Sequence, residues 1–120
     1  MLDIKISLLP AMEQKELERL YGNVWDAIEL VPGLGLTRAR PQDVTVLFPE
    51  DKMHKGLGEY LRVEVEEVQP RPEYNQRKRE LFAHHLKELM FAWFPDAKFI
   101  LVTVRPANPD MHVTTYDKEA

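Results

Sequence analysis

Residues 3–8 carry the sequence DIKISL, and this short alternation near the start of the chain decides the fold. Ile4, Ile6 and Leu8 take every second place, and polar or charged residues stand between them. A period of two residues is typical of a strand with one buried face. We therefore expect the first strand to begin almost at Met1, with no leader ahead of it and with the N-terminus built into the fold.

The rest of the chain repeats a strand, helix, strand plan, and all nine prolines fall between its periodic segments. Apolar residues recur at helical spacing between Leu17 and Val31, and again between Leu81 and Trp93 after a plausible N-cap at Asn75. Strands are predicted over 42–48, 61–66 and 99–104, with a loop over 49–58 and a further short strand over 112–116. The expected fold class is α/β (α+β): two β-α-β units forming a four-stranded mixed sheet with two helices on one face.

Two segments indicate how the sheet is surrounded. The strand at 61–66 has one apolar and one charged face, so the face that the helices leave open must meet water or a partner. The strand at 99–104 is apolar on both faces, which is typical of a central strand or of one covered by a second subunit.

Composition excludes several classes of protein. The 120 residues are 44% hydrophobic and 30% charged, which is usual for a single globular domain, here residues 1–120. No apolar run is long enough to span a membrane and no secretory signal is present, so we expect a soluble, cytoplasmic protein. The net charge of −4 lacks the basic excess that binds nucleic acid, and the absence of cysteine removes thiol chemistry.

The layout resembles the tautomerase superfamily, in its longer macrophage migration inhibitory factor and 5-carboxymethyl-2-hydroxymuconate isomerase branches. The resemblance covers nearly the whole chain and is closest in Pro72-Glu73-Tyr74-Asn75, through the second helix, to Asp96-Ala97-Lys98-Phe99-Ile100. It implies a homotrimer whose sheets enclose a central channel. It also implies a site at the N-terminus, where the family exposes a proline that shuttles a proton between the carbon and oxygen of an enol or keto acid.

The chain departs from that family at the catalytic position, because Leu2 stands where the proline would follow the initiator. Methionine is normally trimmed only before small residues, so Met1 is expected to remain. Its α-amine, with a reference pKa of about 7.7–8.0, is a weak candidate for a base. At most, we expect a divergent tautomerase or isomerase.

Three arginines are candidates for binding a substrate carboxylate, which a guanidinium can hold through two hydrogen bonds. Arg38 and Arg40 precede the second strand, where the resemblance places a basic residue for this purpose, and Arg105 follows the fourth strand. Arg38 and Arg40 could equally be solvated loop residues. Arg62, Tyr60 and Trp25 are weaker candidates, and the two aromatic residues are more typical of packing.

No cofactor or metal is expected. His84 lies one helical turn from both Glu80 and Glu88, but a third ligand of known position is missing. Gly33-Leu34-Gly35 follows a helix and is a turn, not a dinucleotide fingerprint. Alternation along the third strand separates Glu64 and Glu66 from Glu67, so no catalytic carboxylate pair is predicted there.

Three hypotheses follow. The first is a homotrimeric tautomerase-like protein without the proline-dependent mechanism, which binds a small carboxylate-bearing ligand near Leu2. The second is a non-catalytic assembly or binding module. The third is a dimeric ferredoxin-like domain with the same element order, in which another strand separates the two strands that flank each helix.

Overall fold

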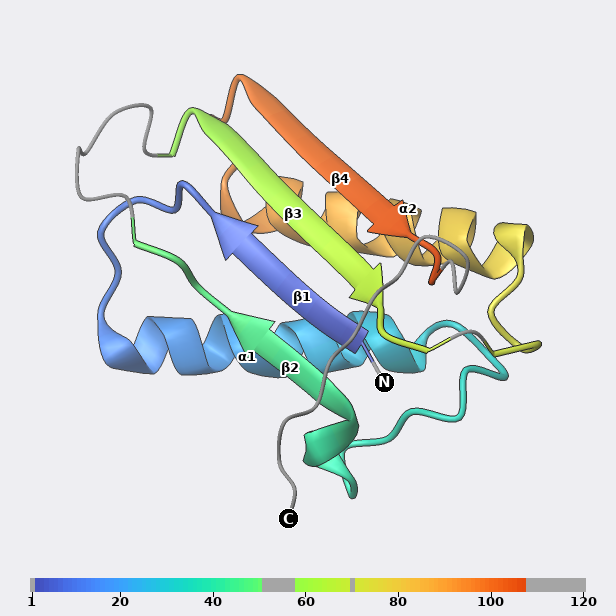
Figure 1. Cartoon of the computed structure of the whole chain (residues 1–120). Helices are drawn as coiled ribbons and strands as arrows, with labels where there is room; N and C mark the ends of the chain where they lie inside the picture. The colour runs from blue at the N-terminus through green and yellow to red at the C-terminus, as the bar shows by residue number, and fades with distance from the viewer. Residues whose placement is uncertain (1, 51–57, 70, 108–120) are drawn as a thin grey trace, which may run out of the picture.

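A computed structural model describes residues 2–50, 58–69 and 71–107, and its elements follow the duplicated plan. The first unit contains β1 (Leu2–Ser7), α1 (Gln14–Glu29) and β2 (Val44–Leu47). The second contains β3 (Tyr60–Glu67), α2 (Gln76–Trp93) and β4 (Phe99–Arg105). Both helices lie against the same face of one four-stranded mixed sheet (Figure 1), as the sequence predicts.

Strand pairing decides between the two folds that share this element order. The sheet order is β2-β1-β3-β4, and β1 pairs with β2, and β3 with β4, in parallel. The two units meet along the antiparallel pair of β1 and β3, in which Leu2 lies opposite Glu67. Because the strands that flank each helix are direct neighbours, the ferredoxin-like hypothesis is wrong.

Local signals fix the helix ends. Glu13 and Glu16 form a capping box at the start of α1, and the Asn75 side chain accepts a hydrogen bond of 2.9 Å from the Lys78 amide at the start of α2. The predicted cap at Asn75 is therefore confirmed. Neither helix in the described ranges is long and apolar enough to cross a membrane.

The structure differs from the prediction in the bounds of two strands and in the position of a third. Leu8 has a φ of 66°, so β1 ends at Ser7 and Leu2 takes the buried place that the alternation gave to Leu8. The second strand starts at Val44 because residues 41–43 form a 3-10 turn, labelled η1 (Pro41–Asp43). β4 is an edge strand, so the first of the two alternatives, a central strand, is wrong, and cover by a second subunit stays a prediction. The predicted strand at 112–116 and most of the predicted loop over 49–58 lie outside the described residues.

The core lies between the sheet and the two helices. Ile4 and Ile6 of β1 and Val63 and Val65 of β3 are fully buried. They are covered by side chains that recur at helical spacing on α1 and α2: Leu20, Val24, Ile28, Phe82, Leu86 and Met90. The core thus occupies one face of the sheet and leaves the other face open.

Candidate functional site

β1 begins at the end of the sheet where β3 and β4 end (Figure 1). Residues around this end line a recess. Its free volume for a water-sized molecule is about 10 Å³, which is room for about one water. Its lining combines apolar side chains with a few polar and charged ones: Leu2, Leu34, Glu67, Tyr74, Lys78, Arg79, Phe82 and Val104. An apolar pocket with a small number of polar groups is the usual form of a small-molecule site.

A buried ion pair forms one wall of the recess. Glu67 is the last residue of β3, points to the helix-covered face, and has a side chain only 2% exposed. Arg79 of α2 donates to both of its carboxylate oxygens, from Nε at 2.6 Å and from Nη2 at 3.0 Å. These hydrogen bonds raise the pKa of Arg79. The bidentate geometry holds both side chains in place and balances the buried negative charge.

Tyr74 supplies the least satisfied polar group of the recess. The residue is 4% exposed, and its hydroxyl oxygen is buried without a hydrogen-bond partner among the described residues. The Arg71 guanidinium lies 5.5 Å from the centroid of the phenol ring, and its charge and its contact with the hydroxyl oppose the rise in the pKa of Tyr74 that burial causes. Burial raises the pKa of Tyr74, so the hydroxyl keeps its proton at neutral pH.

Lys78 adds a second cation to the lining. Its Nζ donates to the Gly33 carbonyl at 3.3 Å and thereby ties the start of α2 to the turn that follows α1. Lys78 and Arg79 together carry two positive charges against the single negative charge of Glu67. The surface of the recess itself is nearly all apolar, so the two cations lie beside it and do not line it with their charged ends.

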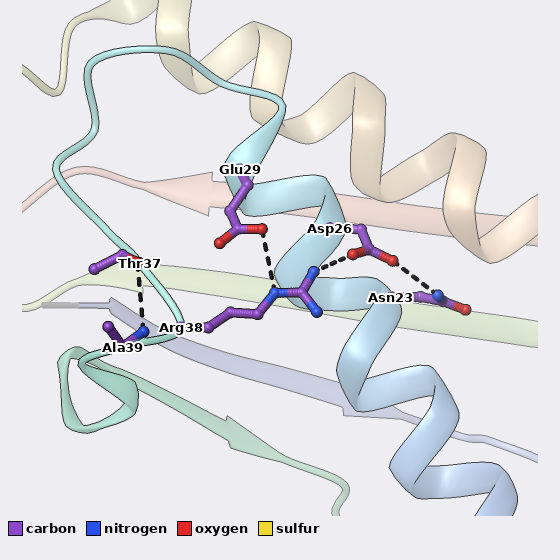
Figure 2. A network of polar contacts seen from close by, with 6 residues as sticks. All are labelled: Asn23, Asp26, Glu29, Thr37, Arg38 and Ala39. Carbon is purple, nitrogen blue, oxygen red and sulfur yellow. Dashed lines mark hydrogen bonds and ion pairs between the residues drawn. The ribbon is translucent and has the colours of Figure 1, made fainter.

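Arg38, the first of the arginines predicted from sequence, is bound to the end of α1 (Figure 2). Its Nη2 donates to Asp26, and its Nε donates to Glu29 at 3.1 Å. Hydrogen bonds from Asn23 and Arg38 lower the pKa of Asp26, and the bond to Asp26 raises the pKa of Arg38. Two carboxylates of the same chain thus occupy this guanidinium, and Arg38 is absent from the lining of the recess.

The other predicted site residues are not brought together. Arg40 is exposed, and its Nε lies 3.5 Å from Asp43, which is a loose ion pair. Arg105 donates to Glu64 at 3.1 Å on the open face of the sheet. Only Leu2 among the predicted residues lines the recess, and Met1 lies outside the described residues. The roles given to Arg38, Arg40 and Arg105 in ligand binding stay predictions.

The weaker candidates lie elsewhere. Trp25 is buried in the core, whereas Tyr60 and Arg62 are exposed on the open sheet face. His84 forms an exposed pair with Glu88 at 3.0 Å, and no cluster of three potential metal ligands occurs within the described ranges. The pair with Glu88 one helical turn away therefore accounts for His84 as a surface residue of α2.

Tyr74, Lys78, Arg79 and the pairing of Glu67 were missed by sequence reasoning, although two of them leave a signal. Strand alternation places Glu67 on the apolar face with Val63 and Val65, where a carboxylate requires a partner. Arg79 stands three residues before Phe82, so it extends the buried stripe of α2 by one turn. No pattern in the sequence predicts that the hydroxyl of Tyr74 is buried.

The comparisons with known proteins agree with this architecture. No family model matches the chain, and no curated protein matches it in sequence. Among solved structures, a protein of unknown function from Vibrio cholerae aligns over 94% of this chain and 83% of its own, with a TM-score of 0.63 and 14% identity. A fused 4-OT, described as a wild-type asymmetric trimer, aligns over 92% and 91%, with a TM-score of 0.62 and 11% identity.

A third structure, Pt0534 inactivated by 2-oxo-3-pentynoate, aligns over 85% of this chain and 83% of its own, with a TM-score of 0.62 and 16% identity. Identities this low show the fold alone. These structural alignments, together with the two parallel β-α-β units, establish that the chain has the tautomerase fold.

Proposed function

We propose that this protein is a cytoplasmic homotrimer of the tautomerase fold that binds a small carboxylate-bearing ligand in the recess beside Leu2. It acts without the proline-dependent mechanism, since Leu2 follows Met1 in the sequence. The observation that carries the proposal is the apolar recess together with the two cations, Lys78 and Arg79, that lie beside it.

The cations beside the recess support an acid as the ligand. At about 10 Å³ the recess itself is far smaller than the roughly 300–1,000 Å³ of pockets for drug-sized ligands, so a ligand has to bind at its mouth or move its lining side chains. Arg79 uses two of its five N–H groups on Glu67, and the other three have no acceptor among the described residues. A ligand carboxylate can therefore bind Lys78 and the free edge of Arg79. Leu2 and Phe82 are only 3% exposed, so the chain of the ligand reaches them only if the lining opens.

The open face of the sheet supports self-association. Four large apolar side chains are exposed on it, between charged ones: Leu47, Tyr60, Phe99 and Leu101. Tyr60 and Phe99 are neighbours in the register of β3 and β4, so part of this apolar surface is continuous. Apolar surface of this kind marks protein interfaces, and the solved fused 4-OT is a trimer.

Calorimetric titration with hexanoate tests the ligand. We expect Lys78→Gln to weaken binding about tenfold or more, because a hydrogen bond to a charged group contributes about 1.5–3 kcal/mol. Lys87→Gln makes the same change at an exposed position of α2 and should leave the affinity unchanged. A loss in Arg40→Ala together with normal binding by Lys78→Gln would move the carboxylate to the loop predicted from sequence.

If wild-type protein binds no acid, the assembly-module hypothesis is favoured instead. The observation behind that second candidate is that Arg38 and Arg105 are already paired with carboxylates of the same chain.

A further inference from the structure

The outer side of α2 carries two large apolar side chains that the fold leaves exposed. Leu81, His84, Glu88 and Phe91 recur at steps of three and four residues, so they share one side of the helix, opposite its buried residues. Leu81 and Phe91 are 36% and 37% exposed. The exposed residues of α1, in contrast, are all polar or charged. We call these four residues of α2 the outer stripe.

The order of residues in the outer stripe is complementary to its own reverse. Leu81 and Phe91 each stand five residues from Leu86, and His84 and Glu88 each stand two residues from it. If a second α2 lay antiparallel on the first, with a two-fold axis at the level of Leu86, Leu81 of each copy would lie opposite Phe91 of the other. His84 of each copy would lie opposite Glu88 of the other. The outer stripe therefore has the self-complementarity that a two-fold interface requires.

The surface of the outer stripe is hollowed where a facing helix would place a side chain. The hollow has a volume of about 500 Å³ and is lined by His84, Lys87, Glu88, Phe91 and Ala92. The first four of these have the spacing i, i+3, i+4, i+7, which forms the four-residue hole that accepts one side chain of a facing helix in a coiled coil. The antiparallel alignment brings His84 of the second copy to this hole. Within one chain His84 Nε2 lies 3.0 Å from Glu88 Oε1, so each side chain keeps a second polar atom for the other copy.

We propose that the outer stripe is a docking surface for a second copy of this chain, in which two α2 helices pack antiparallel about a two-fold axis. The inference goes beyond the proposed function, because this contact joins the helix sides of two molecules, whereas the proposed trimer joins their sheet faces. A second copy is the occupant because it matches all four positions of the outer stripe, with an apolar pair at each end and a His–Glu pair on each side of the axis.

The contact is weak between two single chains. A stripe about 27 Å long and about 10 Å wide on each copy gives an interface of about 500 Å², well below the roughly 1,200–2,000 Å² of stable complexes. The two Lys87 side chains also come near each other beside the axis, and like charges repel. The contact therefore forms in concentrated protein, and dilute protein shows only the assembly that the sheet faces make.

Disulfide trapping tests the contact, and the chain has no cysteine that would interfere. His84→Cys and Glu88→Cys are prepared separately, mixed in concentrated solution and oxidised, and the linked peptides are identified by mass spectrometry. We expect the mixed dimer, linked between positions 84 and 88, to exceed either self-linked dimer about tenfold, because only these two positions lie opposite each other within reach of a disulfide. The mixed dimer also keeps one contact between His84 and Glu88.

Glu18→Cys supplies the control, since it places the cysteine at an exposed position of α1. Its mixture with Glu88→Cys should give mixed and self-linked dimers in random proportions. Random proportions in the test mixture as well, or an excess of dimers linked from 84 to 84 or from 88 to 88, would overturn the antiparallel contact.

Sedimentation velocity over a dilution series measures the same contact without cross-linking. The average mass of wild-type protein should rise with concentration, and Phe91→Asp should weaken this association about tenfold or more, because it buries a charge opposite an apolar side chain. Glu88→Lys changes a side chain that is 67% exposed, so it leaves the fold intact, and it should also weaken the association by removing the acceptor for His84.

Leu30→Asp places the same charge on an exposed leucine outside the outer stripe and should associate as wild type does. A wild-type mass that stays constant over the dilution series, or equal association by wild type, Phe91→Asp and Glu88→Lys, would contradict the inference. Either result leaves the proposed trimer and its ligand unaffected, because the outer stripe includes no residue of the sheet or of the recess.

Discussion

Replacement of Arg79 with methionine should lower the free energy of unfolding by about 3–5 kcal/mol. The substitution keeps the apolar stem of the side chain but leaves the carboxylate of Glu67, 2% exposed, without its cation. An isolated buried charge costs far more than a lost surface contact. Urea denaturation of the single variant measures the effect.

Two controls isolate the buried charge. The double variant Glu67→Leu/Arg79→Met removes both charges and should recover most of the loss, because an apolar pair of similar volume is often as stable as a buried ion pair. Arg38→Met breaks the exposed pairs with Asp26 and Glu29 and should cost no more than about 1 kcal/mol. A loss below about 1 kcal/mol in Arg79→Met would mean that Glu67 is solvated in solution.

Replacement of Leu101 with aspartate should dissociate the protein into monomers. Leu101 lies on β4 at the edge of the sheet, is 40% exposed on the open face, and is opposite Arg62 in the register with β3. In the proposed trimer a partner subunit covers this side chain, and burial of a charge there is unfavourable even beside Arg62, because the desolvation cost can exceed the gain from the ion pair. Light scattering should give three times the 14.1 kDa chain mass for wild type and the chain mass for the variant.

The same change away from the sheet serves as the control. Leu30 follows α1 and is 61% exposed, and Leu30→Asp should leave the assembly intact. A monomeric wild-type protein, or a Leu101→Asp variant with unchanged mass, would contradict the proposed interface.

Much of the fold could be predicted from periodicity because burial imposes it. The spacing of Leu20, Val24 and Ile28 reflects one buried helix face, and the alternation of Val63 and Val65 reflects one buried strand face. The position of β4 could not be predicted, because an apolar strand looks the same whether neighbouring strands or a partner subunit cover it. The predicted first strand wrongly included Leu8, because the alternation of polar and apolar residues does not reveal a backbone φ of 66°.

The candidate site was predicted only in outline. Leu2 lines the recess, since the fold brings the start of β1 to the ends of β3 and β4, but its role in ligand binding stays a prediction. Arginines in predicted loops are natural candidates for ligand binding, but carboxylates of the same chain can already bind them, as Asp26 and Glu29 bind Arg38. The satisfaction of a hydroxyl such as that of Tyr74 depends on tertiary contacts that no local pattern encodes.

The position of the ligand is tested most directly by amide chemical shifts of isotope-labelled wild-type protein during titration with hexanoate. Binding in the recess predicts the largest shifts at Leu2, Leu34 and Tyr74, which come from three separate segments and meet only there. The largest shifts in the groove between α1 and α2, at Asn23, Leu30 and Leu89, or an unchanged spectrum at saturating ligand, would contradict the account.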